Sequence, residues 1–530
     1  MSRARRILHY NWAQFDDPEF RGGGVSVYLR NLLDKLAGDP RYEFAVLSAG
    51  HHYTYTNRTT RYEPTPNILE DRGVRSFRIL NSPVKAPAHD MFYDIGLWRS
   101  DPEIARAFAE VLTAQGPFDD VVLHSMEGIS SEVLALKEQF PQTRFHYMWH
   151  NYMPLCPQIE LLYQNRFDCT DYEGGLKCQG CIGGFHSREQ LIVPQRFGSS
   201  LEFARLSGRP LGNFLFGAGI GSYKVAQACG YFLKDLRRSV RGAFSKNEGA
   251  PVRGRGFQSV DISAAGPGPE GRSLGAVARK GGEYRAWREL NLALLKRFDS
   301  HMCVSQLVAD TITGLGMLPH KVHVTPLGMD LHATPAQMRK RAAAKPKHDR
   351  LRLSFIGYGI PSKGLPFITE ALMKADLPVL KEKAELVIYA RLGEHDMLKL
   401  APLTERFADV RVVQGYERRD LAKIASDIDL NIVPSIWRET YNQVAYELLC
   451  LGTPSLLSST VGLGMFWGGQ PDFVFRSGSQ ADFVARLGKI VANPRLLEEF
   501  WQSPPELPTM DQHIAMALAA MQGGKRNEAA

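Results

Sequence analysis

The first 330 residues alternate between short apolar runs and longer segments with apolar residues at helical spacing. Residues 6–10 form the first apolar run, and a glycine-rich loop leads from it to residues 26–37, where apolar residues recur every three or four positions. A strand, a glycine loop and a helix in this order form the first unit of a nucleotide-binding sheet domain. Further strands are expected at residues 44–50, 118–125, 143–150, 300–305 and 321–328.

A second series of strands and helices follows. Because strands that alternate with helices favour parallel sheets, the two series predict an α/β protein with two doubly wound, Rossmann-like domains. The strands of this series are expected at residues 351–359, 385–390, 410–415, 429–434 and 453–459. We place the first domain at residues 1–328, a linker rich in Ala, Lys and Arg at 329–350, the second domain at 351–490, and C-terminal helices at 491–530, including a helical pattern at 510–521.

An insertion, at about residues 151–283, interrupts the first series. Its last part, residues 241–282, holds ten glycines without sustained periodicity, so we expect it to be flexible or disordered. The preceding segment, residues 210–236, is apolar with small residues and leads into several Lys and Arg residues. It is interpreted either as a buried helical hairpin on the first domain or as a segment that lies on an anionic membrane surface.

The charge and composition of the chain limit the kinds of partner that it is expected to bind. The net charge is +8, and residues 234–289 alone hold 12 Lys and Arg against 6 Asp and Glu. This local excess fits anionic lipid head groups, nucleic acid or substrate phosphates, or else a solvated loop. No apolar run of signal-peptide length follows the basic N-terminus, and no 18 uncharged apolar residues occur together. We therefore expect a cytoplasmic protein, with peripheral contact at the inner face of the membrane as an option.

Four of the seven cysteines gather in the insertion. The spacing of Cys156, Cys169, Cys178 and Cys181 ends in a Cys-x2-Cys pair, which lets two thiolates reach one tetrahedral ion. Structural zinc, unligated thiols and an iron–sulfur cluster remain open interpretations.

Two carboxylates, Glu439 and Glu447, stand eight positions apart where a polar loop meets a helix expected at residues 441–451. Eight residues of helical rise span about 12 Å, which is close to the distance from the sugar ring to the ribose of a nucleotide sugar. The unpaired N–H groups of the first helical turn lie between them, where a diphosphate would bind. Two glutamates with this spacing are more often ordinary charged residues of a helix. The residues around the pair therefore decide whether it indicates a donor site.

These surroundings, Pro434-Ser435 before the pair and Leu451-Gly452-Thr453-Pro454 after it, resemble the donor-site signature of retaining glycosyltransferases of the GT-B fold, family 4. The resemblance implies C-terminal helices that cross back to the first domain, a nucleotide sugar as co-substrate, and no cofactor for catalysis. It also implies that Glu439 orients the sugar, Glu447 holds the ribose, and Tyr441 and Asn442 complete the donor site.

A second motif resembles the strand and loop that open the donor domain of this family. Residues 355–359, with Gly357, are followed by Ser362-Lys363-Gly364, and Lys363 matches the lysine that neutralises the leaving diphosphate. Tyr358 stands where the family usually has Arg, so either another basic residue, such as Arg391 or Arg438, compensates or turnover is slow. Further departures are Asn442 in place of a common Gly and the lack of an acidic residue in 461–465.

The first domain offers a loop and two histidines. Gly22, Gly23 and Gly24 resemble the family's glycine loop, which allows close backbone approach to the donor. His150 resembles the histidine at a strand end that lines the reacting face, and it is favoured over His124, which ends an earlier strand.

Together these features predict a retaining glycosyltransferase of polysaccharide or glycoconjugate biosynthesis, with a saccharide or lipid-linked acceptor. His150, Lys363 and Glu439 are its expected catalytic residues. One alternative is a catalytically weak GT-B-like scaffold, which the missing Arg suggests. The other is a zinc-containing nucleic-acid-binding protein, although nucleic acid is the less expected partner.

Overall fold

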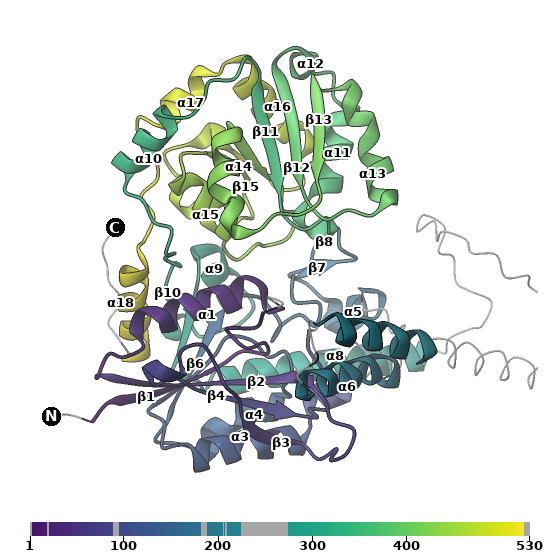
Figure 1. Cartoon of the computed structure of the whole chain (residues 1–530), viewed down its shortest axis with the longest axis vertical. Coiled ribbons are helices and arrows are strands. Elements are labelled where there is room, and N and C mark those ends of the chain that lie inside the picture. Colours follow the sequence, from purple (N-terminus) through teal and green to yellow (C-terminus); the bar gives the residue numbers. More distant parts are fainter. Residues whose placement is uncertain are drawn as a thin grey trace, which may run out of the picture.

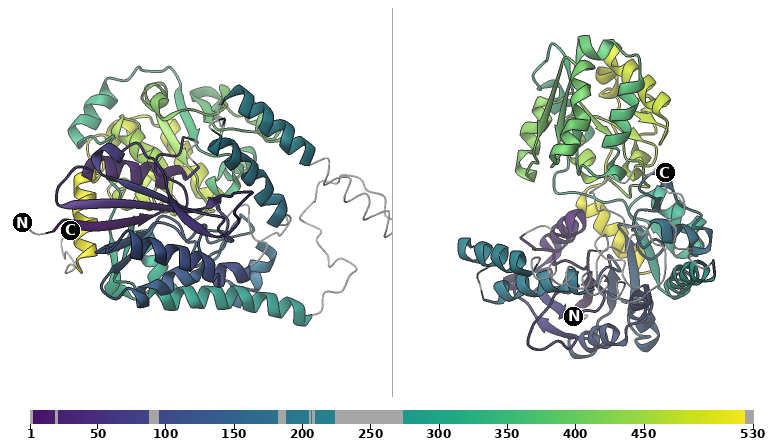
Figure 2. Two further views of the ribbon diagram at one scale, coloured as in Figure 1. Left: turned by 60° about the horizontal axis from the view of Figure 1, so that its bottom comes forward. Right: turned by 90° about the vertical axis from the view of Figure 1, so that its right-hand side faces the viewer.

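The computed structural model has two large sheets of mainly parallel strands, each flanked by helices. One sheet stands above the other in Figure 1. A third, two-stranded sheet belongs to the insertion. The right-hand view of Figure 2 shows the same two lobes from the side, with the last helix lying against the lower lobe. The structure describes residues 3–18, 21–87, 95–181, 188–204, 206, 209–223 and 274–523.

The first domain is built on a sheet with the order β10-β9-β6-β5-β1-β2-β4-β3, parallel except for the edge strand β3. The chain runs outward in one direction from β1 to β4 and in the other from β5 to β10, so the order reverses between β1 and β5. The strands are β1 (Arg5–Tyr10), β2 (Tyr42–His52), β3 (Arg61–Pro64), β4 (Arg75–Leu80), β5 (Asp120–Leu123), β6 (Arg144–Trp149), β9 (Ser300–Cys303) and β10 (Val322–Val324).

Helices cover this sheet because their apolar residues form stripes that face it. In α3 (Pro102–Ala114), for example, Ile104, Phe108 and Val111 are fully buried, and the Asp101 carboxylate accepts from the Ile104 N–H at 2.9 Å to cap the first turn. The other helices of this domain outside the insertion are α1 (Gly23–Leu36), α2 (Ile95–Arg99), α4 (Ser131–Gln139) and α9 (Gln306–Gly314).

The second domain repeats the plan with the order β13-β12-β11-β14-β15-β16, all parallel. Here the order reverses between β11 and β14. The strands are β11 (Leu351–Ile356), β12 (Ala384–Tyr389), β13 (Asp409–Val413), β14 (Leu430–Val433), β15 (Ser455–Ser458) and β16 (Val474–Phe475). The helices are α11 (Leu365–Lys374), α12 (Val379–Lys383), α13 (Glu394–Leu400), α14 (Leu421–Asp427), α15 (Gln443–Cys450), α16 (Gln480–Ala492) and α17 (Arg495–Phe500).

The segment between the domains carries a helix of its own, α10 (Pro335–Ala343), which begins with a capping box between Thr334 and Gln337. The Arg341 guanidinium donates to the carbonyl of Cys450 at 2.6 Å, which ties α10 to the end of α15. The connection is therefore fastened to the second domain.

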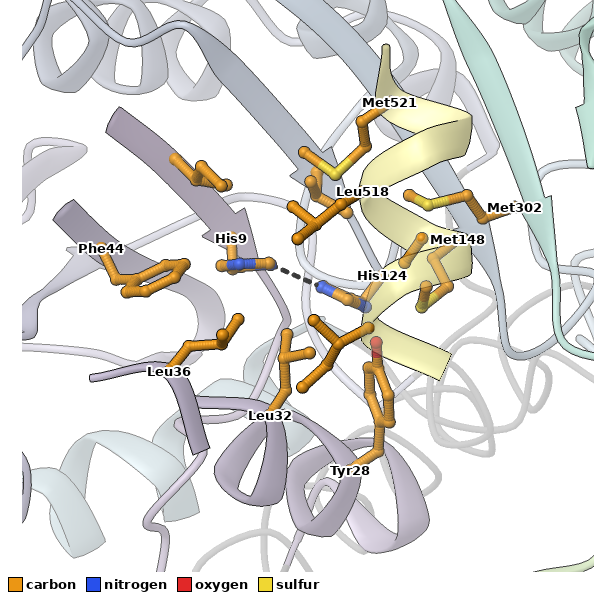
Figure 3. Close-up of a pocket in the computed structure, with 14 residues that line it drawn as sticks. His9, Tyr28, Leu32, Leu36, Phe44, His124, Met148, Met302, Leu518 and Met521 are labelled. Atoms are coloured by element: carbon orange, nitrogen blue, oxygen red, sulfur yellow. Dashed lines mark hydrogen bonds between the residues drawn. The ribbon is translucent and has the colours of Figure 1, made fainter. Parts of the chain in front are cut away.

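The final helix, α18 (Met510–Met521), lies beside α1 on the first domain, although α16 and α17 belong to the second (Figure 1). His513, fully buried, donates from Nδ1 to the carbonyl of Pro326 at 2.9 Å, so its Nε2 accepts from the Tyr28 hydroxyl at 2.8 Å. A small cavity between α18, α1 and the sheet is lined mainly by apolar side chains, with His9 and His124 among them (Figure 3).

The insertion extends to one side of the first domain (Figure 1). Residues 241–273 of the segment expected to be flexible lie outside the described residues, but residues 274–282 begin a long helix, so that expectation is wrong for them. Among the described residues, no helix has the length and apolar character that crossing a membrane requires. The elements of the insertion are β7 (Leu162–Tyr163), β8 (Phe167–Asp168), α5 (Leu176–Cys181), α6 (Arg188–Phe203), a helix at residues 210–223 and α8 (Leu274–Leu295).

Candidate active site

Most of the residues predicted to form the site follow the carboxyl ends of strands beside the two points where strand order reverses. In open parallel sheets, ligands bind at such points. Lys363 follows β11, and Glu439 follows β14. The Ile436 N–H donates to the Ser362 carbonyl at 3.0 Å, so the loops after these two strands are joined.

Glu439 is buried, with 4% of its surface exposed, and both of its oxygens are bonded. Oε1 accepts from Lys363 Nζ at 2.5 Å and from Asn442 Nδ2 at 3.1 Å, while Oε2 accepts from the Ser435 hydroxyl. Lys363 Nζ also lies 5.4 Å from the centre of the Trp437 ring. A carboxylate so well bonded is held in one orientation, which suits it to position a ligand.

Asn442 shapes the start of α15. Its φ of 84° is in the left-handed region, and its side chain accepts from the Ala445 N–H at 2.8 Å as a helix cap. The helix therefore begins at Gln443, and the predicted start at Tyr441 is wrong because Asn442, at positive φ, caps the helix from outside. The 12 Å spacing assumed eight helical residues and does not apply, because Glu439 lies in the loop. Asn, which tolerates this conformation, can replace the family's Gly here.

Glu447 lies on the buried side of α15, with 4% of its surface exposed. Arg418 donates to its Oε1 from Nε at 2.8 Å and approaches the same oxygen with Nη2 at 2.7 Å. Burial raises the pKa of Glu447, and Arg418 opposes this effect. Within the described chain, Oε2 of Glu447 receives no hydrogen bond, so it remains available to a hydroxyl. No local pattern in the sequence indicates Arg418, which is 29 residues away from Glu447.

Tyr441 and the glycine loop join the domains. The Tyr441 hydroxyl donates to the Leu327 carbonyl at 2.7 Å, so this buried ring braces the interface. Gln443 Nε2 donates to the carbonyl of Gly24 at 3.0 Å, which brings the glycine loop to the first turn of α15. Gly23 begins α1 with a φ of 54°. The loop and the predicted donor site are thus adjacent.

The two arginines expected near the diphosphate differ in whether they already have a partner in the protein. Arg438 donates to the Asp168 carboxylate of β8 at 2.8 and 3.0 Å, so it would have to leave this partner to reach a diphosphate. Arg391 is exposed and makes no ion pair or hydrogen bond with the described residues. Tyr358 is 68% exposed. Arg391 therefore remains the candidate for this role.

Two of the three glycines in the loop after β11 differ in how much space their backbone leaves for a side chain. Gly364 has a φ of 82°, and a Cβ there would lie 1.9 Å from the Pro434 carbonyl oxygen, so only glycine lets the Lys363 turn pack on the loop after β14. A Cβ on Gly357 would meet only the Phe355 ring at ordinary contact distance. Its backbone is thus free of this constraint.

His150 comes to the same place from the first domain. Its carbonyl accepts from the Thr440 hydroxyl at 2.9 Å, and Thr440 follows Glu439 directly. His150 is 9% exposed, whereas His124 is 1% exposed and hydrogen-bonds His150 through the two rings. A second link between the domains joins the Ser362 hydroxyl to Glu160 Oε1 at 2.9 Å, a contact that no sequence pattern indicated.

The four cysteines of the insertion are close enough to influence one another, but they do not form a ready ligand set. Burial raises the pKa of Cys156 and Cys178 to about 12, which keeps them as thiols. The Cys181 thiol donates to Gln158 Oε1 at 2.6 Å. In the part of the chain that the structure describes, no three His, Cys, Asp or Glu side chains are arranged to hold a metal ion, so the predicted zinc set is not found.

Solved structures share this architecture over nearly the whole chain. A sucrose-phosphate synthase (tll1590) from Thermosynechococcus elongatus is 13% identical, with 98% of this chain and 97% of that chain covered and a TM-score of 0.53. A UDP-forming α,α-trehalose-phosphate synthase from Burkholderia vietnamiensis is 12% identical (98% and 94% covered, TM-score 0.52), as is an α,α-trehalose 6-phosphate synthase from Burkholderia multivorans (99% and 94%, 0.51). This is the GT-B fold. The predicted fold is confirmed, and the family-4 assignment stays a prediction.

The sequence itself gives no further assignment, since neither a family model nor a curated protein matches it. The likeness to GT-B glycosyltransferases therefore shows the fold. What the site does has to be argued from its residues.

Exchanges at Asn442 test the backbone conformation at the start of α15. Asn442→Ala and Asn442→Gly both remove the amide's hydrogen bonds, so their difference isolates the left-handed φ. We expect the Ala variant to be less stable than the Gly variant by about 1–2 kcal/mol in urea unfolding. Equal stability would mean that residue 442 can relax into another conformation at no cost.

Proposed function

We propose that the protein is a retaining glycosyltransferase that moves a sugar from a nucleotide-activated donor to a saccharide or lipid-linked acceptor in polysaccharide or glycoconjugate biosynthesis. The observation that carries the proposal is the Glu439–Lys363 pair at the carboxyl end of the second sheet, one residue from the Thr440 contact with His150. A carboxylate for sugar hydroxyls, a cation for phosphate and a histidine from the opposite domain thus gather at one place.

The donor is proposed to lie along α15. Oε2 of Glu447, to which no described residue donates, would accept from the ribose hydroxyls, and Glu439 would accept from the sugar. Lys363 and Arg391 would neutralise the diphosphate, with N–H groups of the first turn of α15 as further donors. Gly23, Gly24 and Gly357 would allow close backbone approach, and Asn442 and Tyr441 would hold the loop that carries Glu439.

Retention is proposed to follow from attack on the face that the nucleoside diphosphate leaves. The acceptor hydroxyl forms the new bond to the anomeric carbon as the bond to the diphosphate oxygen breaks, and a phosphate oxygen takes the hydroxyl proton. Because both oxygens of Glu439 are already bonded, this carboxylate suits orientation of the sugar better than nucleophilic attack.

A thermal-shift screen with UDP-, GDP- and ADP-sugars tests donor binding. UDP comes first because one protein of the same fold is named as UDP-forming. A matching donor at 100 times its Kd should stabilise the fold by about 2.7 kcal/mol and raise Tm. No shift with any nucleotide sugar would contradict the proposal, and a shift without sugar transfer to any acceptor would favour the scaffold alternative.

Variants of the two carboxylates separate their roles. Glu447→Ala should weaken donor binding by roughly tenfold with less effect on turnover, because it removes a ribose contact that does not change during the reaction. Glu439→Gln should lower kcat by roughly 10- to 100-fold with less change in donor affinity. Glu405→Gln, an exposed carboxylate on the same domain, is the matched control. Wild-type kinetics for both site variants would refute the assignment.

We further propose that the acceptor is a lipid-linked saccharide. The helix at residues 210–223 contacts α6 through Phe216 and Phe197, whose rings stack 6.1 Å apart. Its other side chains are unusually exposed for apolar residues, with Leu211 at 57% and Phe214 at 70%. Such an apolar face supports contact with a membrane surface.

Sedimentation with vesicles tests this contact. We expect binding to anionic vesicles at low salt, with weaker binding to neutral vesicles and at high salt, since each basic residue near the surface adds about 1 kcal/mol. Leu211→Ser with Phe214→Ser should reduce binding at least tenfold. Phe167→Ser, which changes an exposed ring on β8, is the control. Equal and negligible binding to both vesicle types would remove this support for a lipid acceptor.

A further inference from the structure

Three buried histidines form a continuous row from the core of the first domain to the candidate site. His9 lies on β1, His124 follows β5, and His150 follows β6; these strands are neighbours in the sheet. His9 Nδ1 is 3.0 Å from His124 Nε2, and His124 Nδ1 is 3.1 Å from His150 Nε2. The rings are stacked with centroids 5.2 and 5.3 Å apart, and Figure 3 shows the inner link of the row.

The rings of this row are neutral at ordinary pH. Burial lowers the pKa of His9 to about 4 and that of His150 to about 3, and it lowers the pKa of His124 well below the usual value. A neutral imidazole has one nitrogen that donates and one that accepts. Each ring therefore carries a single N–H.

His124 makes the direction of the row uniform, because both of its nitrogens are used. If its Nε2 accepts from His9, its Nδ1 must donate to His150, which leaves the remaining N–H of the row on His150 Nδ1. If the direction is reversed, His150 donates inward, the remaining N–H sits on His9 Nε2, and His150 Nδ1 becomes a bare acceptor. The row thus has two possible hydrogen-bond directions. The surroundings of its two end nitrogens, His9 Nε2 and His150 Nδ1, determine which direction is lower in energy.

The inner end of the row favours the first state. His9 Nε2 is buried and has no hydrogen-bond partner among the described residues. The nearby carboxylate of Asp120 is bonded to Arg5 and His146 instead. An orphaned buried N–H is rarer in proteins than an unpaired acceptor and costs the full loss of its hydrogen bond to water. A bare lone pair on His9 Nε2 is therefore the lower-energy choice.

The outer end of the row is His150, a residue whose backbone borders the candidate site. His150 Nδ1 makes no hydrogen bond with the described residues, and the same residue is joined through its carbonyl to Thr440, beside Glu439. We propose that His9 and His124 are positioning residues that fix His150 as the Nδ1–H tautomer, so that it donates a hydrogen bond to a substrate oxygen and does not act as a general base. The nature of that substrate, a sugar hydroxyl, rests on the proposed function.

Ring ¹⁵N NMR of histidine-labelled protein without any substrate tests the tautomer directly. Signals are assigned by their loss in single variants. We expect His150 and His124 to carry their protons on Nδ1 and His9 Nε2 to be unprotonated. A wild-type spectrum with the His150 proton on Nε2 would overturn the proposal, whether or not any variant folds.

Two exchanges at His124 test its positioning role. His124→Asn keeps an N–H donor close to the position of Nδ1, whereas His124→Phe keeps the stacked ring and removes the donor. The Asn variant should retain the Nδ1–H tautomer of His150 and lose less than about tenfold in kcat, since a neutral hydrogen bond is preserved. The Phe variant should shift His150 toward the Nε2–H tautomer and lose roughly 10- to 100-fold in kcat. An unchanged tautomer in the Phe variant would refute the role of His124.

A matched pair at His150 separates a donor from a base. His150→Asn presents an N–H where Nδ1–H was, and His150→Asp presents only acceptor oxygens. A donor role predicts that the Asn variant is at least tenfold more active than the Asp variant, and the reverse order would overturn the proposal. Because the spectra need no substrate, failure to find any sugar transfer would refute the proposed function and leave the tautomer result standing.

Discussion

The contact between Lys363 and Glu439 holds the candidate site together. A carboxylate that is 4% exposed must be compensated, and the Lys363 ammonium at 2.5 Å does so from a different loop. Removing one partner of a buried pair costs more than the pair contributes, because the other charge stays buried alone. The pair therefore holds the loops after β11 and β14 together. It also fixes the position of the adjacent residue Thr440, whose hydroxyl donates to the His150 carbonyl.

The domains meet through polar contacts that are each specific to one pair of residues. Ser362 bonds Glu160, Arg438 bonds Asp168, and Gln443 bonds the Gly24 carbonyl, so the insertion and the glycine loop both reach the second domain. A nucleotide sugar entering between the domains would replace some of these contacts with its own.

The sequence predicted the sheets well because buried parallel strands are nearly continuous apolar runs, as in residues 429–434. It missed β4, whose residues Arg75–Leu80 mix charge with apolar side chains. It placed the start of α15 two residues early because the φ of Asn442 depends on its surroundings. The Arg418–Glu447 pair depends on the packing of α14 on α15, and the row formed by His9, His124 and His150 depends on which strands are neighbours. Local patterns do not contain that information, so His124 and His150 read as rival candidates although they act in one row.

The position of α18 has a consequence for synthesis of the protein. Ile514, Leu518 and Met521 line the same cavity as Leu32 and Leu36 of α1, so the first domain completes its core with residues from the far end of the chain. Domains generally fold as units while the ribosome adds about 5–20 residues per second. The apolar face that α18 covers also includes Met302 of β9, so it is complete well before residue 510 is added, and a nascent chain stalled in between would present this face to chaperones.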